Sequence, residues 1–265
     1  MSLLLVCGGV FTAVTYGGDT DVKSGEEEQI DEKYITHEMT ESEIKELKKD
    51  VGVKDPDKDY NEIVDGHGTG WAPPSEEDYG SMKGSTFVDD VSSDKDDLRA
   101  SRDLTTKKYF PPVGNQGSQG SCAAWATGYY TNTFAQARAY DYDASSGNDE
   151  YRMSPAWIYN HVNGGEDSGA TLEGCSEHVD TVGSSNWANM PYDQYDHTSW
   201  GSESAWRNAP KYRTSEFIKT HVSNTDVIKS WVNSSKLVSF AMDSNQYDWS
   251  DDDILSSQEY DAGNP

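Results

Sequence analysis

The chain has 265 residues and carries 47 acidic side chains against 21 basic ones, which gives a formal net charge of −26. A surface this acidic repels phosphate backbones, so we expect no nucleic acid partner. Only three cysteines are present, Cys7, Cys122 and Cys175, which excludes a disulfide framework and a cysteine-based metal cluster, and we expect no cofactor. The acidic excess is densest in residues 19–97, where a solvated face or solubility in salt explains it more simply than an acidic recognition patch.

Residues 1–16 contain a short apolar run that ends in small residues. The run has the length of a signal-peptide core and is too short to span a bilayer, but it lacks the positively charged start of a secretion signal. We expect residues 1–16 to be a signal peptide, incomplete at its start, on a secreted or extracellular protein without stable membrane insertion. The alternatives are a run of another kind and lipid attachment at Cys7, which the preceding Val6 disfavours.

Residues 17–97 form an acidic N-terminal extension that is poor in apolar residues. One helix is predicted from Thr40 to Val51, because Thr40 and Glu43 form a capping box and apolar residues recur on one face. The rest of the extension is predicted to be loop or partly disordered.

Within this extension, residues 65–69 spell D-G-H-G-T, the histidine motif of subtilisin-like serine peptidases. The residues that follow do not continue that motif, and no matching serine segment occurs later in the chain. A glycine-rich turn before Pro73 and Pro74 is the better interpretation.

The segment from Phe110 to Tyr130 is predicted to bring one cysteine to the start of a helix. Glycines break the loop before Cys122, Ser121 can cap the helix, and the helix is expected to continue to about Tyr140. Unpaired backbone N–H groups and the helix dipole favour a thiolate at Cys122, and a thiolate is a nucleophile. The Gln116 amide can fold back beside the sulfur as a second oxyanion donor. A cysteine at a helix start is more often an ordinary buried thiol, but the glycines and Gln116 reverse that expectation.

Further elements are predicted downstream of this helix. Cys175 shares an apolar helical stripe that begins at Leu172, which indicates a core residue. The stretch 186–215 is predicted to be a loop packed by its own aromatic residues. The remaining predictions are a helix capped by Ser154 with Pro155 at its first position, a helix opened by Thr225, and a strand over Leu237–Met242.

Several of these segments resemble the papain-like cysteine peptidases. Gln116 to Cys122 matches the family's glutamine, glycine and G-S-C signature, Ser154 to Asn160 matches its S-P-x-x-x-Y-N helix, and Pro191 and Tyr192 match its P-Y turn. The resemblance covers about residues 98–243. Two departures are Ala123, where the family has an aromatic residue, and Gln119, where many members carry a cysteine.

The resemblance implies an α+β, two-lobed papain-like fold for residues 98–265, with the helical lobe present and the sheet-rich lobe largely missing. It implies that Cys122 is the nucleophile, that Gln116 helps to hold the oxyanion, and that Ser168 and Gly169 pair with the backbone of a protein or peptide substrate. Ser168 replaces the family's first glycine, so a plain loop remains the alternative there. Residues 17–97 take the place of a propeptide.

The resemblance also implies a histidine base and an orienting asparagine, and neither follows in the expected order. His221 is the last histidine and precedes the Thr225 helix, whereas the family's histidine follows it; His161, His178 and His197 are interpreted as surface or loop residues. We therefore expect a cysteine-type endopeptidase whose base lies beyond Pro265, and a chain that is inactive as it stands. The alternative is a non-catalytic peptide-binding or scaffold protein. The sequence does not indicate an oligomeric state.

Overall fold

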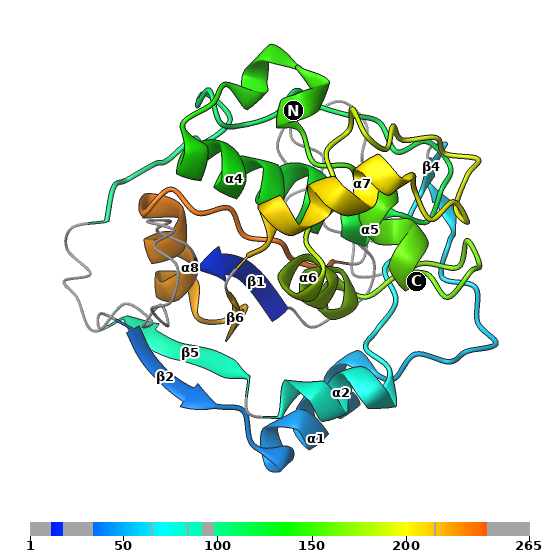
Figure 1. Cartoon of the computed structure of the whole chain (residues 1–265). Coiled ribbons are helices and arrows are strands. Elements are labelled where there is room, and N and C mark those ends of the chain that lie inside the picture. Colours follow the sequence, from blue (N-terminus) through cyan, green and yellow to red (C-terminus); the bar gives the residue numbers. More distant parts are fainter. Residues whose placement is uncertain are drawn as a thin grey trace.

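The fold is mixed α+β, with a helical body beside a small sheet (Figure 1). The computed structural model describes residues 12–17, 34–64, 66–83, 85–91, 98–214 and 216–242. The apolar run of residues 1–11 with Cys7, and the acidic segment that follows residue 242, lie outside the described residues.

The helices and strands follow a mixed order along the chain. The strands are β1 (Thr12–Gly17), β2 (Tyr34–Glu38), β3 (Ile63–Val64), β4 (His67–Gly68), β5 (Thr86–Val91) and β6 (Glu216–His221). The α-helices are α1 (Glu41–Val51), α2 (Glu76–Met82), α3 (Cys122–Ala124), α4 (Thr133–Tyr140), α5 (Pro155–Val162), α6 (Leu172–Thr181), α7 (Glu203–Asn208) and α8 (Thr225–Asn233). The described residues also include a π-helix, η2 (Trp125–Asn132), and the 3-10 turns η3 (Ala144–Ser146), η4 (Asp149–Tyr151) and η5 (Ala209–Tyr212).

The larger sheet combines strands from both ends of the chain in the order β1-β6-β5-β2. β1 is antiparallel to β6, β5 is parallel to β6, and β2 is antiparallel to β5 with an irregularity at Ile35 and Thr36. β6 therefore has a hydrogen-bonded neighbour on each edge. α8 packs on this sheet through Val227 and Trp231, which lie in one buried cluster with Val88 and Ile218.

The helical body is organised around the continuous segment α3-η2-α4. All eight residues of η2 are buried, so this part of the segment has no solvent-facing side, as expected for a helix inside a core. The predicted helix from Cys122 to Tyr140 is confirmed, but its middle winds as a π-helix, which shifts the 3.6-residue register assumed from the sequence. α5 and α6 pack against its first half, and Cys175 on α6 is fully buried, as predicted.

Part of the extension was predicted correctly and part was not. α1 has the predicted capping box, in which the Thr40 side chain accepts from the Glu43 backbone N–H. The prediction that the rest of the extension is loop or partly disordered is wrong where β2, α2 and β5 form. α2 begins with a second capping box, Ser75 with Asp78. Four buried residues join these elements in a small core: Met39, Ile44, Tyr79 and Met82.

The downstream predictions had mixed outcomes. Ser154 caps α5 with Pro155 in the first turn, and α6 and α8 lie where they were predicted. The expected strand over Leu237–Met242 is wrong, since only Ser239 has a strand-like bridge. The aromatic-rich stretch 186–215 contains α7, which was not predicted. None of the helices in the described residues is long and apolar enough to cross a membrane.

Candidate functional site

Cys122 is the first residue of α3 and is covered in this structure. Its side chain is 3 % exposed and packs in the same buried cluster as Trp71 and Tyr159. The expected N-cap bond of Ser121 is absent; the Ser121 hydroxyl instead lies 2.8 Å from the hydroxyl of Tyr192, which donates to the Gln116 carbonyl at 2.8 Å. Tyr192 therefore holds both ends of the loop that leads to Cys122, a contact that the sequence did not indicate.

A peptide segment of the extension lies on this loop, and we call residues 60–72 the strap. The strap contacts the loop before Cys122, where the Gly68 N–H donates to the Gly117 carbonyl at 2.8 Å. Its far end pairs with residues 168–170: the Ala170 N–H donates to the Gly70 carbonyl at 2.8 Å, and the Ala72 N–H donates to the Ala170 carbonyl at 3.0 Å. The strap therefore pairs through its backbone with the loop before Cys122 and with residues 168–170.

The strap folds as a hairpin, which confirms the turn predicted from its glycines. β3 and β4 form the arms of the hairpin, and Gly66 lies between them with a φ of 79°. The Thr69 hydroxyl donates to the Tyr60 carbonyl at 3.2 Å, so the two arms also bond through a side chain. The inner arm, residues 68–72, is buried between the outer arm and the Cys122 loop.

The predicted oxyanion donor, Gln116, bonds to the strap. Its side-chain amide donates to the Gly68 carbonyl at 2.6 Å and to the Gln119 carbonyl at 2.9 Å. Both N–H groups are therefore engaged, one of them by a peptide carbonyl that removal of the strap would free. A role for Gln116 in holding an oxyanion stays a prediction.

The other two predicted site residues, Ser168 and Gly169, belong to the segment 168–170, which pairs with the strap. The Ser168 carbonyl accepts from the Tyr60 N–H at 3.1 Å, and the Gly169 N–H donates to the Tyr159 hydroxyl at 3.2 Å. Gly169 has a φ of 102°, and a Cβ there would overlap the Gly70 carbonyl. The structure thus brings Gln116, Ser168 and Gly169 together around the strap, and backbone pairing uses Ser168 and Ala170.

Asp167 connects these parts and was not identified from the sequence. Its Oδ1 accepts from the Tyr159 hydroxyl at 2.7 Å and from the Gly120 N–H at 2.9 Å, and its Oδ2 accepts from the Asn61 amide of the strap at 3.2 Å. Burial and then Asp167 raise the pKa of Tyr159, and Cys122 adds to the rise, so this hydroxyl remains protonated next to the thiol.

Replacing Asp167 is expected to lower stability in two graded steps. Asp167→Ala removes the two oxygens that accept three hydrogen bonds and should lower the free energy of unfolding by about 2–3 kcal/mol. Asp167→Asn keeps an oxygen for Tyr159 and Gly120 and loses only the Asn61 contact, so its loss should be about half as large. Urea unfolding of the three chains measures both values; an equal loss for Asn and Ala would mean that the contact to Asn61 dominates.

The described histidines do not behave as surface residues throughout, and this corrects the prediction. His161 on α5 and His178 on α6 lie with ring centroids 5.1 Å apart in an aromatic cluster with Trp157, Trp200 and Trp206. The buried nitrogens His161 Nδ1 and His178 Nε2 have no hydrogen-bond partner. Burial lowers the pKa of both rings, that of His178 to about 4.

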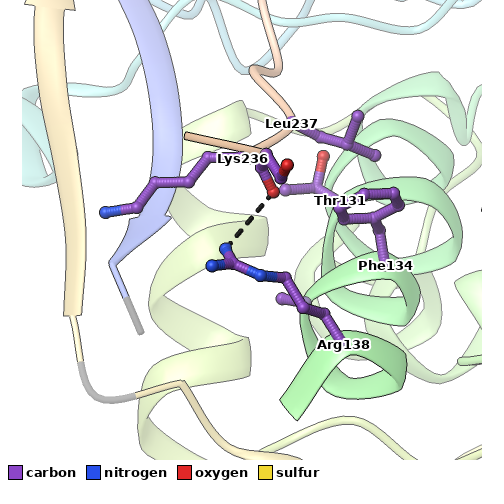
Figure 2. A pocket seen from close by; sticks show the side chains of 7 residues that line it. Thr131, Phe134, Arg138, Lys236 and Leu237 are labelled. Atoms are coloured by element: carbon purple, nitrogen blue, oxygen red, sulfur yellow. Dashed lines mark hydrogen bonds between the residues drawn. The ribbon is translucent and has the colours of Figure 1, made fainter. Parts of the chain in front are cut away.

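A separate pocket lies away from these residues. It lies between the segment η2-α4 and the turn after α8 (Figure 2), and the Arg138 guanidinium donates there to the Ser235 carbonyl at 3.4 Å. None of the four predicted site residues lines it. The labelled lining residues are Thr131, Phe134, Arg138, Lys236 and Leu237.

The described residues contain no cluster of three or more His, Cys, Asp or Glu side chains that could hold a metal ion. Burial raises the pKa of the Cys175 thiol to about 12, so Cys175 stays protonated and inert at neutral pH. Cys122 therefore remains the candidate nucleophile among the described cysteines. Comparison with known proteins finds no matching family model, no matching curated protein and no matching solved structure.

Proposed function

We propose that this chain is the helical part of a papain-like, cysteine-type endopeptidase whose peptide-binding cleft is occupied by its own strap. Cys122 is the nucleophile, its N–H and the Gln116 amide stabilise the oxyanion, and residues 168–170 bind the substrate backbone. Such a mechanism also needs a general base, and none of the contacts of the described histidines assigns that role to one of them, so the proposal rests on the thiol and the peptide-binding groups alone. The strap keeps the site latent, as a propeptide does.

The observation that supports this proposal is the way a peptide lies beside Cys122. The Gln116 amide holds a peptide carbonyl, that of Gly68, at 2.6 Å, and the same strand pairs with Ala170 two residues later. A site that binds its own backbone through an amide donor and an edge-strand contact has the groups needed to bind another peptide.

Reagents that combine a peptide with an electrophile test the proposal on the full chain. A peptidyl chloromethyl ketone should alkylate Cys122 about ten-fold faster or more than chloroacetamide, because the cleft adds binding energy to the reaction. Mass spectrometry locates the label, and the Cys122→Ser chain is the control for labelling elsewhere. Equal relative rates at Cys122 and at the other cysteines would contradict a peptide-binding cleft at this thiol.

One observation favours the alternative, a non-catalytic peptide-binding or scaffold protein. β6 pairs with β1 on one edge and β5 on the other, so the strand does not need a further lobe to satisfy its backbone. In a scaffold, Cys122 has no chemical role, and Cys122→Ser should leave peptide binding unchanged while the peptidyl reagent shows no preference for Cys122. The same two chains therefore separate the two functions.

A further inference from the structure

We propose that the Cys122 cleft selects peptides that carry glycine at two alternate positions, an inference that rests on the proposed function. The strap supplies the pattern: Gly68, Thr69 and Gly70 form the part of it that lies on the Cys122 loop. A Cβ added at Gly68 or at Gly70 would point at the loop, whereas the Thr69 side chain bonds to the outer arm.

The strap lies so close to the loop before Cys122 that a side chain at Gly68 or Gly70 has no room. A Cβ added at Gly68 would lie under 3.0 Å from the Gln119 and Ser118 carbonyls, and one at Gly70 would lie under 3.0 Å from the Gly120 backbone. Real Cβ atoms essentially never approach other atoms so closely, and these neighbours are backbone atoms that cannot rotate away as side-chain ends do.

Further hydrogen bonds fix the loop of residues 118–120 in place, so it cannot move away from the strap. Gln119 is fully buried, and its side-chain amide lies 3.3–3.4 Å from the carbonyls of Asp193, Gln194 and Asp196. The Ser118 N–H donates to the Gln194 side chain at 2.8 Å, and the Gly120 N–H donates to Asp167. A peptide that enters the cleft along this loop meets a fixed surface at both positions.

Thr69 gives the matched contrast within the same stretch. Its hydroxyl bonds to the outer arm, at Tyr60 and Glu62, and its side chain makes none of the contacts that exclude a Cβ at the two glycines. The chemical class that the cleft accepts is therefore a peptide with the pattern Gly-x-Gly, in which the middle residue is free to vary.

Competing peptides test this inference through the rate at which iodoacetamide alkylates Cys122 in the full chain. Three synthetic peptides are compared: residues 66–73, the same peptide with alanine replacing both Gly68 and Gly70, and the same peptide with alanine replacing Thr69. The first and third should slow alkylation about ten-fold more than the second at equal concentration. The Gly70→Ala chain, which cannot close its own strap well, is used first; the unsubstituted chain gives the same ranking over longer incubation if that variant does not fold.

The outcomes separate the two levels of the argument. Equal protection by the peptide with two alanines would overturn the glycine selectivity and leave the peptide cleft standing. Failure of all three peptides to protect Cys122 in either chain would overturn the cleft itself, and the selectivity with it. Protection of Cys122 with the alkylation rate of Cys7 unchanged is the expected pattern.

Discussion

Gly70→Ala is expected to expose Cys122, raising its rate of alkylation by iodoacetamide about ten-fold or more. A Cβ at this position would overlap the Gly120 backbone, and the φ of 85° is unfavourable for alanine. Together the overlap and the strained φ should cost the closed strap about 2 kcal/mol or more, and each 1.4 kcal/mol changes an equilibrium ten-fold. Cys122 is 3 % exposed and shares a buried cluster with Trp71 of the strap, so opening of the strap is expected to raise the reactivity of this thiol.

Gly66→Ala is the matched control, because it has the same kind of backbone without the contact. Gly66 has a φ of 79° and an added Cβ would meet nothing within 4 Å. Backbone strain is therefore shared by the two variants, and only Gly70→Ala adds the overlap with Gly120. A similar gain in Cys122 reactivity for both would assign the effect to hairpin strain, and no gain for Gly70→Ala would mean that the strap does not control access to the thiol.

Helices could be predicted where the sequence carries a local pattern, such as residues that mark where a helix begins. The capping box at Thr40, the serine and proline that open α5, and the apolar stripe of α6 are all local patterns, and each predicted a helix that forms. α2 carried the same kind of pattern in Ser75 and Asp78 with acidic residues in its first turn, so it could have been predicted.

The sheet could not be predicted in the same way, because its pairing is not local. β6 includes Lys219, which is 2 % exposed and lies between β1 and β5. From the sequence, a lysine at this position predicts a solvent-facing side of a half-buried strand. In the fold Lys219 is interior, and desolvation of its ammonium lowers its pKa. Only the neighbouring strands, brought from residues 12–17 and 86–91, make that position interior.

In the candidate site, too, local patterns could be predicted and contacts between distant segments could not. Cys122 and Gln116 were predicted from the loop and the helix start, and Ser168 and Gly169 by resemblance. Gln116, Ser168 and Gly169 lie against the strap. The strap itself was predicted only as a turn, since its glycines fit against carbonyls about 50 residues later in the chain. Asp167 was missed for the same reason, because its three partners come from three separate segments.

A second large effect is expected in mild acid, from the histidine pair of α5 and α6. His178 has a pKa lowered to about 4 by burial and by the neighbouring His161, against an ordinary value of 6.5. A group whose folded pKa is lowered in this way binds its proton more readily in the unfolded chain. Its contribution to stability is complete above pH 6.5 and is lost as the pH falls from 6.5 to about 4, by about 3 kcal/mol in total.

His178→Phe should remove most of this acid-dependent loss. Phenylalanine keeps a ring against Trp157 and cannot be protonated, and the Nε2 that it replaces has no hydrogen-bond partner to lose. Urea unfolding at pH 7.0 and pH 4.5 should show a much smaller difference for His178→Phe than for the unsubstituted chain. His197→Phe, which changes a histidine outside the aromatic cluster, is the control and should keep the full difference.

Other titrating groups act in different directions or in a different pH range, which is why the comparison between chains is needed. Asp89 raises the pKa of His37, so His37 gains stabilising charge as the pH falls through its folded pKa. Hydrogen bonds and nearby lysines lower the pKa of Glu41 and Glu46, whose contributions are lost only as the pH falls below 4.5. Both effects are common to all three chains and cancel in the difference. An undiminished loss between pH 7.0 and 4.5 in His178→Phe would show that the histidine pair does not set the acid sensitivity, and that the cluster packs as well when charged as when neutral.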